Sequence, residues 1–262
     1  MYTANRISVA IDGNTLLHNI SLGFNPGELC VIVGPNGAGK TTLLKVLDGE
    51  ITPDAGSVSF LDKELHIWNK HEIARLRSVL PQSSTLEFPF TVYDVVELGR
   101  LPHEKDKRTN EAVIKEVIRI CDIEDLTERP YPYLSGGEQQ RVQIARVLAQ
   151  IWKLNQGKPG FLLLDEPLSA LDLSHQYSLL NSLKKITTDQ GVGIICILHN
   201  LNLAAQFSHR CVILDNGRLV ADGAPMDVFT KETLSNVFDL DIHIQAHPDN
   251  KEIPLIIPRV QF

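Results

Sequence analysis

Residues 34–42 carry a pattern that could hold phosphate groups. They follow a short apolar run, open a stretch of helical periodicity, and are Gly34, Pro35, Asn36, Gly37, Ala38, Gly39, Lys40, Thr41 and Thr42. This is the GxxxxGK[ST] pattern in the strand–loop–helix context that it requires. Glycines let backbone N–H groups turn toward phosphates, and the helix N-terminus adds partial positive charge. We therefore predict a nucleoside triphosphate site in which Lys40 meets the β and γ oxygens and the Thr41 hydroxyl ligates Mg²⁺. The flanking strand and helix disfavour the alternative, a glycine-rich turn without a ligand.

A second segment ends in two adjacent carboxylates. Phe161 to Leu164 is an apolar run typical of a buried strand, and Asp165 and Glu166 follow it directly. Asp165 at the strand end suits a magnesium-associated acid, and Glu166, which projects differently, could polarise a water molecule for in-line attack on a γ-phosphate. A strand that ends in solvated acids is the alternative, and the phosphate-binding pattern disfavours it.

A third segment opens a predicted helix with a hydroxyl and two glycines. Its residues are Leu134, Ser135, Gly136, Gly137 and Glu138. Ser-x-x-Glu is also a helix capping box, but capping needs no paired glycines. Exposed amides and a hydroxyl at a helix N-terminus could bind a second anion.

The elements that must position these residues can be predicted from hydrophobic patterning. Residues 29–33, 161–164 and 193–198 are continuous apolar runs, which are typical of strands buried on both faces of a parallel sheet. A helix with Leu179, Leu180, Leu183 and Ile186 on one face lies between the last two, so a βαβ unit is expected. Residues 211–221 predict a hairpin with a type I′ turn at Asn216-Gly217. Short alternating runs at 7–11, 16–24 and 57–61 predict antiparallel strands.

Residues 91 to about 154 have helical spacing without a convincing strand. We predict an α/β fold with a P-loop nucleotide-binding core, a mainly parallel sheet, an N-terminal antiparallel β subdomain and an inserted helical subdomain. The expected division of this single domain is 1–90 and 156–240 for the core, 91–155 for the helical part and 241–262 for a C-terminal tail without an assigned role.

Composition excludes several classes of protein. The 262 residues are 43% apolar, with 25 basic and 32 acidic residues and a net charge of −7. Nucleic-acid binding requires a basic surface, so no nucleic-acid partner is expected for this acidic chain. No apolar run approaches the roughly 18 residues of a membrane span, and no secretory leader is evident, so we expect a cytosolic chain. The four cysteines lack metal-ligand spacing, and three lie in apolar runs.

The three motifs together resemble the ATP-binding subunits of ABC transporters, over roughly residues 7–241. The resemblance implies ATP hydrolysis with Mg²⁺ and gives further residues a role. Gln82 falls at the Q-loop and His199 at the switch histidine, so both join Glu166 as catalytic residues, and Thr41, Gln82 and Asp165 are the implied Mg²⁺ ligands. The D-loop would be Ser169, Ala170, Leu171 and Asp172. The family's adenine-stacking aromatic position holds Val9, and Tyr2 is the nearest aromatic residue.

The resemblance also implies partners. In the family, ATP is held between two copies arranged head to tail, with Ser135 to Glu138 of one copy on the ATP of the other. Two transmembrane permease subunits would dock on the segment from Gln82 to about His103, at the cytoplasmic face of the inner membrane. A periplasmic substrate-binding protein would act indirectly.

A narrower resemblance rests on residues 79–84, 88–92 and 97–103, which are similar to importers of iron chelates, haem and cobalamin, and within that branch to the hemin importers. Three alternatives stay open: a siderophore or cobalamin importer, an ABC ATPase that serves as an assembly factor, and a P-loop kinase or GTPase. The last would leave Ser135 to Glu138 and the D-loop unexplained.

Overall fold

The computed structural model describes residues 1–82, 88–103, 106–152 and 159–259. The chain forms two compact units, one of residues 1–67 with 195–262 and the other of residues 68–194. These borders do not coincide with the expected borders at 90/91 and 155/156, because strands of the predicted core pack with the helical segment in the second unit. Ser78 on one such strand donates a hydrogen bond to Gln150 on a helix at 3.0 Å. The division expected from the sequence stays a prediction.

The first unit begins with an antiparallel sheet, as predicted. Its strand order is β2-β1-β4-β5, with β1 at Tyr2–Ile11, β2 at Asn14–Phe24, β4 at Ala55–Phe60 and β5 at Lys63–Glu64. The buried β1 side chains are Tyr2, Ala4, Ile7 and Val9, which alternate on each side of an irregularity between Ala4 and Ile7. The alternation that predicts these strands therefore points one face of the sheet into a core.

The same unit contains the strands that carry the phosphate-binding segment. Strand β3 (Leu29–Val33) is buried at every residue and pairs in parallel with β9 (Arg210–Asp215). Helix α1 (Lys40–Asp48) follows β3. Strand β10 (Arg218–Gly223) pairs antiparallel with β9. The turn between them has φ 45° at Asn216 and φ 70° at Gly217, which confirms the predicted hairpin with a primed turn.

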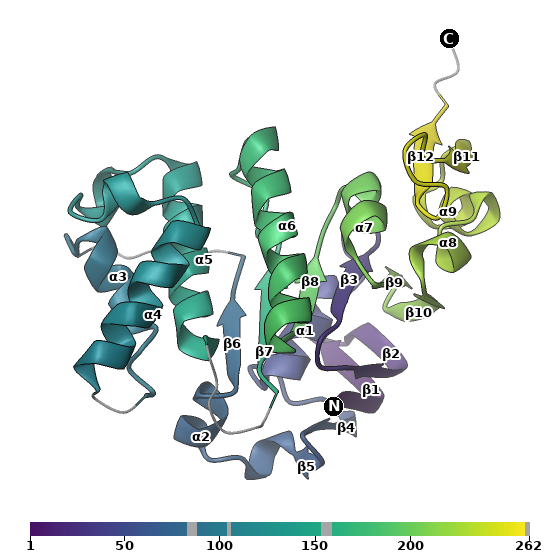
Figure 1. Cartoon of the computed structure of the whole chain (residues 1–262). Helices are drawn as coiled ribbons and strands as arrows, with labels where there is room; N and C mark the ends of the chain where they lie inside the picture. Colours follow the sequence, from purple (N-terminus) through teal and green to yellow (C-terminus); the bar gives the residue numbers. More distant parts are fainter. Residues whose placement is uncertain (83–87, 104–105, 153–158, 260–262) are drawn as a thin grey trace. The chain divides into compact units, whose positions relative to one another are not determined.

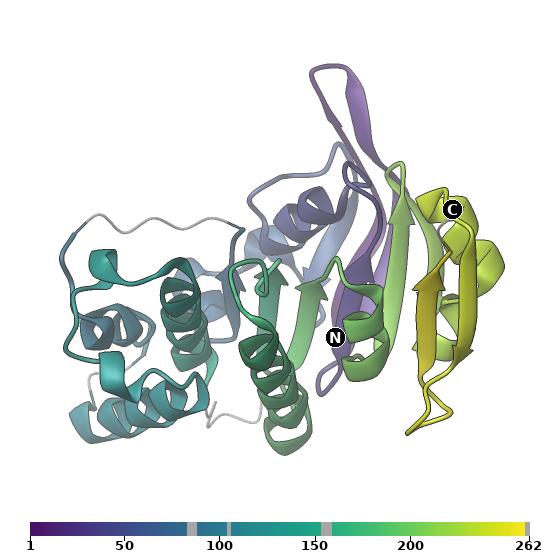
Figure 2. The same cartoon turned by 90° about the horizontal axis from the view of Figure 1, so that it is seen from above.

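The C-terminal part of the first unit is more regular than the sequence suggests. It contains α7 (Leu201–Phe207), α8 (Pro225–Val228) and α9 (Lys231–Phe238). Strands β11 (Ile242–Ala246) and β12 (Pro254–Pro258) then form an antiparallel hairpin (Figure 2).

The second unit joins a parallel strand pair to helices. Strand β6 (Arg77–Leu80) pairs in parallel with β7 (Phe161–Asp165), with Leu80 opposite Leu164. The helical insert is confirmed: its described residues contain α3 (Val92–Leu98), α4 (Lys107–Ile120) and α5 (Gly136–Ile151), grouped together in Figure 1. Short 3₁₀ turns lie at Glu124–Leu126 and Tyr131–Tyr133, after α4. The second unit also contains helices α2 (Lys70–Ala74) and α6 (Leu173–Gln190). A further 3₁₀ turn, Leu65–Ile67, lies in the first unit, at the end of residues 1–67.

The larger sheet has the strand order β10-β9-β3-β8-β7-β6, and the border between the units falls within β8 (Gly193–Ile197). The predicted strand–helix–strand succession β7–α6–β8 is present. The four cysteines are buried free thiols, and three of them lie in β3, β8 and β9. Among the described helices, none has the length and apolar character needed to cross a membrane.

Candidate functional site

The phosphate-binding segment lies between β3 and α1 in the first unit. A Cβ atom at Gly34 would clash with the carbonyl oxygen of Leu214 on β9, and Gly217 donates its N–H to Ala38 O at 3.1 Å. The loop therefore rests directly on the β9–β10 hairpin, which only a glycine at position 34 permits. Gly39 is the N-cap of α1, and no side chain caps this helix. The segment thus presents backbone amides at a helix N-terminus, where an anion is favoured.

Lys40 is the buried cation of this loop. Its side chain is 6% exposed, and its Nζ donates to Gly34 O and Pro35 O, both at 2.8 Å. These two carbonyls hold the ammonium group inside the turn of the loop. Thr41 is half-buried on the first turn of α1. The arrangement places positive charge and helix amides together, which suits a polyphosphate.

His199 lies in the same unit, two residues after the end of β8. The preceding residue, Leu198, donates its N–H to Ile32 O on β3 at 3.2 Å. The following residue, Asn200, caps α7 because its side chain accepts from Asn202 N and Leu203 N at 3.0 and 3.1 Å. The exposed His199 is thus carried on a short segment held at both ends.

The acidic pair lies in the second unit, at the end of β7. Asp165 is 3% exposed, whereas Glu166 is half-buried and has a left-handed backbone with φ 50°. The register of β6 on β7 brings the exposed Gln82 to the same edge, since it follows Leu80 by two residues and Leu80 pairs with Leu164. The structure therefore places Gln82, Asp165 and Glu166 at neighbouring strand ends, as parallel pairing predicts.

The predicted second anion site forms a capping box. Ser135 N and Oγ both donate to Glu138 Oε2 at 2.7 Å, and Glu138 N donates to Ser135 Oγ at 3.4 Å. The bonds from Ser135 hold the pKa of the Glu138 carboxyl below its ordinary value. Ser135 and Gly136 remain exposed. Capping, weighed as an alternative from the sequence, is therefore present, and the anion-binding role of this turn stays a prediction.

A reason for one of the paired glycines comes from the D-loop segment. A Cβ atom at Gly137 would lie 3.0 Å from the carbonyl oxygen of Ala170. Gln140, on the same helix, donates to Pro167 O at 3.1 Å. The start of α5 is thus packed against residues 167–170, and a side chain at position 137 would crowd this contact. No motif pointed to Gln140; its contact follows from the fold.

The rest of the D-loop leads into α6. Asp172 caps α6 by accepting from His175 N at 2.9 Å, and its carboxylate also pairs with His175 Nδ1 at 2.7 Å. These bonds hold the pKa of the Asp172 carboxyl below its ordinary value. Ser169 and Ala170 are exposed and Leu171 is buried. The exposed residues 169 and 170 and the exposed residues 135 and 136 therefore belong to one packed corner of the second unit.

The position expected for adenine stacking does not offer a surface. Val9 is 2% exposed and Tyr2 is fully buried, where its hydroxyl donates to Leu47 O and its ring lies 4.9 Å from the ring of Phe60. Both side chains are part of the core beside the antiparallel sheet. Neither can stack on a base.

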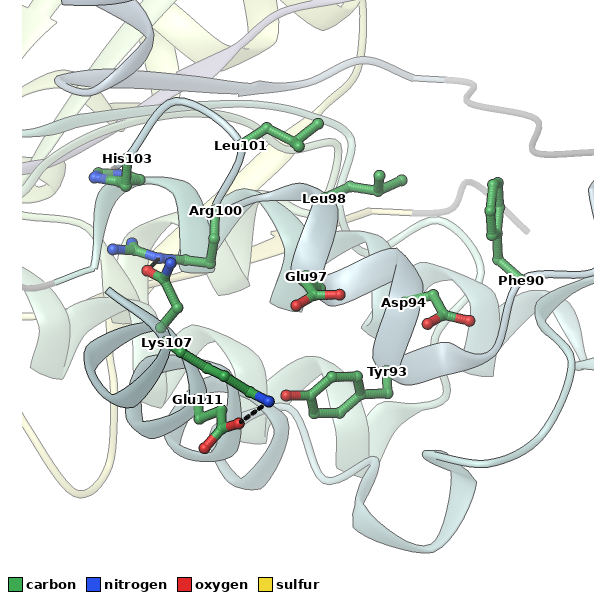
Figure 3. A pocket seen from close by; sticks show the side chains of 11 residues that line it. Phe90, Tyr93, Asp94, Glu97, Leu98, Arg100, Leu101, His103, Lys107 and Glu111 are labelled. Carbon is green, nitrogen blue, oxygen red and sulfur yellow. Dashed lines mark hydrogen bonds and ion pairs between the residues drawn. The ribbon is translucent and has the colours of Figure 1, made fainter. Parts of the chain in front are cut away.

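The second unit also carries a groove of about 820 Å³ over α3 and α4. Its lining residues are Phe90, Tyr93, Asp94, Glu97, Leu98, Arg100, Leu101, His103, Lys107, Asn110 and Glu111. In Figure 3, Leu98 and Leu101 lie on one side of it, and Glu97 and the pair Lys107–Glu111, at 3.9 Å, lie on the other.

Two polar residues that line this groove, Arg100 and His103, are bonded to backbone carbonyls near the end of α5. Arg100 donates to Ala149 O at 2.5 Å and to Asn110 Oδ1 at 2.9 Å. His103 Nε2 lies 2.6 Å from Gln150 O, and burial lowers the pKa of this histidine. The segment predicted to receive a membrane partner, from Gln82 to about His103, contains several of the lining residues; its residues 83–87 lie outside the described part of the chain.

Comparison with known proteins decides the family. A family model described as ABC transporter matches residues 17–169. The chain is 41% identical over 257 residues to the hemin import ATP-binding protein HmuV of Escherichia coli O157:H7, covering 98% of this chain and 99% of that protein. It is 45% identical over 260 residues to HmuV of Gloeobacter violaceus, covering 98% and 94%.

This chain belongs to the ABC transporter family. The resemblance drawn from its motifs is thereby confirmed, and the chain is a nucleotide-binding ATPase of the ABC type.

Solved structures agree on the fold. A metal-chelate type ABC transporter in an inward-facing conformation superposes with a TM-score of 0.80 at 24% identity, covering 99% of this chain and 97% of the other. A dimeric bacterial ABC transporter cassette gives a TM-score of 0.75 at 25% identity, covering 86% and 99%. The predicted α/β architecture with its P-loop core is that of these proteins.

Proposed function

We propose that this ABC ATPase energises the import of hemin through a membrane transporter. The proposal is supported by the two HmuV relatives, whose alignments span nearly the whole of each chain. The observation that carries the ATPase chemistry is the buried Lys40, with its ammonium group held at 2.8 Å from two carbonyls of the loop at the start of α1. Such a point charge beside a helix N-terminus is suited to the β and γ phosphates.

Three residues have the donor chemistry for Mg²⁺, which prefers oxygen ligands. They are the Thr41 hydroxyl, the Gln82 carbonyl and the carboxylate of Asp165, which is 3% exposed. The ion would neutralise charge that develops on the phosphates. Glu166, one residue beyond Asp165, orients and deprotonates the attacking water, and His199 contacts the γ-phosphate from its place after β8.

We assign the second half of each nucleotide site to another copy of the chain. Ser135 and Gly136 at the start of α5 are exposed beside the exposed Ser169 and Ala170, so this corner can face a partner. The dimeric cassette with a TM-score of 0.75 supports this arrangement. ATP is then contacted by residues 34–42 of one copy and by Ser135 to Glu138 of its mate, and hydrolysis separates the two.

The groove on α3 and α4 is the proposed docking site of a permease helix. Leu101 is 76% exposed and Phe90 is 39% exposed, so a partner would cover apolar surface there (Figure 3). Glu97 on the opposite side favours a partner segment with basic side chains. Two permease subunits would thus hold the dimer at the cytoplasmic face of the inner membrane, and a periplasmic binding protein would deliver the substrate.

The experiment that tests this function identifies the membrane partner and the substrate. The chain is purified with its associated membrane proteins, reconstituted in vesicles, and assayed for ATP hydrolysis with hemin, a ferric siderophore or cobalamin on the binding-protein side. We expect a polytopic partner and stimulation by hemin alone, while the Glu166→Gln complex measures background. If a ferric siderophore or cobalamin stimulates ATP hydrolysis instead, that compound and not hemin is the substrate. Recovery of assembly proteins without a polytopic partner would contradict the transport role.

A further inference from the structure

The C-terminal hairpin is bonded to the helix that follows His199. Asn202, the second residue of α7, donates from Nδ2 to Ile256 O at 3.0 Å and accepts from Ile256 N at its Oδ1 at 2.8 Å. Both bonds join residues 54 positions apart in the chain. The side chain of Asn202 therefore meets β12 as a neighbouring strand would, through one donor and one acceptor.

This contact depends on the amide. Ile256 is 3% exposed, so its main-chain groups need partners inside the protein. Strand β12 pairs with β11 on one edge, and Asn202 serves its other edge. An aspartate at position 202 could accept from Ile256 N but could not, when ionised, donate to Ile256 O. The pair of bonds thus needs a neutral amide, which supplies one donor and one acceptor.

The contact lies close to the proposed switch residue. Leu198 N is bonded to β3, the Asn200 side chain caps α7, and Asn202 is bonded to β12. Helix α7 has only seven residues, and helices of that length depend on packing for their stability. Residues 198–202 are therefore held at three successive points, of which the last belongs to the C-terminal hairpin.

We propose that the hairpin β11–β12 positions His199 for hydrolysis, and that Asn202 is the positioning residue that transmits this constraint. The inference rests on the proposed role of His199 at the γ-phosphate. The inference gives the C-terminal tail a function. If the bonds between Asn202 and β12 are lost, nucleotide binding stays intact, but the segment that carries His199 loses its orientation.

The test measures ATP hydrolysis by the full chain with Asn202→Ala and with the nearly isosteric Asn202→Asp. We expect kcat to fall about 10- to 100-fold, because small displacements of a catalytic group cost up to about 100-fold in rate. The KM for ATP should stay within about twofold, since residues 34–42 are untouched. Gln206→Ala, one turn further along the same helix, is the matched control and should leave both constants unchanged.

A second arm separates positioning from stability. In the His199→Ala background, the Asn202 substitutions should have no further effect on the residual rate, because they act through His199. An equal additional loss in that background, a parallel rise in KM, or loss of the global fold in both Asn202 variants would show a structural role and overturn the inference. If both Asn202 variants keep the wild-type kcat while His199→Ala is impaired, the inference about the hairpin is wrong, but the proposed role of His199 stands. Wild-type kcat in His199→Ala would refute the role of His199 in the proposed function itself.

Discussion

At the scale of single residues, Glu166 combines a reactive side chain with an unusual backbone. Its φ of 50° is in the left-handed region, which costs a residue with a Cβ about 1–3 kcal/mol. Asp165 before it is buried at the end of β7, and Glu166 O accepts from Ser169 N at 3.3 Å after it. The surrounding structure thus holds a conformation that turns Glu166 away from the line of the strand. The acidic pair is predictable from the sequence, but the turn is not, because it depends on contacts on both sides.

Replacing Glu166 by glutamine tests its role as the base. The amide keeps the size of the side chain and loses the proton acceptor, so hydrolysis should slow by about 10²–10⁴-fold with ATP binding retained. Sedimentation with Mg²⁺ and ATP should then show a stable dimer that the wild type forms only transiently. Glu72→Gln, at an exposed carboxylate on α2, serves as the control. Full turnover by the Glu166 variant would remove this residue from the mechanism.

At the scale of elements, the start of α5 shows how one sequence pattern serves two purposes. The spacing of Ser135 and Glu138 predicts a capping box, and the structure contains it. The need for glycine at position 137 could not be derived from that spacing, since it arises from the Ala170 carbonyl of a segment about thirty residues later. Capping orders the helix start, and the glycine lets the D-loop approach it.

The cap should make this helix sensitive to acid. Ser135→Ala should lower the free energy of unfolding by about 0.5–2 kcal/mol at pH 7. The pKa of Glu138 is lowered in the folded chain from its ordinary value of 4.5. The carboxylate therefore stabilises the fold at pH values above 4.5, and this contribution is lost as pH falls through the lowered pKa. The cost of Ser135→Ala should therefore shrink as pH falls below 4.5 and through the lowered pKa of Glu138.

Urea unfolding of the wild type and the variant at each pH measures this cost. Asn69→Ala removes the cap of α2, in which the Asn69 side chain accepts from His71 N at 2.9 Å. No carboxylate takes part in this cap bond. Its cost should not follow the same pH dependence. A cost of Ser135→Ala that is constant from pH 7 to pH 3 would contradict the contribution of the Glu138 carboxylate.

Other elements show where sequence patterns stop being informative. Strand β7 is predictable because every residue is apolar up to Asp165. Strand β6 is not, since its four residues include Arg77 and the buried Ser78, whose hydroxyl is bonded to Gln150 on α5. Strand β12 begins and ends with proline and depends on Asn202, 54 residues earlier. Strands β6 and β12 are stabilised by residues that are distant in the sequence, so a local sequence pattern cannot predict them.

At the scale of the whole molecule, the candidate site residues are divided between two compact units. Residues 34–42 and His199 belong to one unit, and Gln82, Glu166 and Ser135 belong to the other. Each group is ordered by its own local contacts: the loop by the β9–β10 hairpin, and Ser135 by its cap with Glu138. The central claim of the proposed mechanism is that Lys40 of one copy and Ser135 of its mate act on the same ATP.

Mixing two inactive variants tests that claim most directly. Lys40→Ala should not hold the phosphates, and Ser135→Arg should block the second surface, so each variant alone should hydrolyse little ATP. In a shared-site dimer of one copy of each, one site collects both lesions and the other is intact. We predict that hydrolysis rises on mixing and is highest near equal amounts. A mixture no more active than the average of the two variants would contradict a site shared between copies.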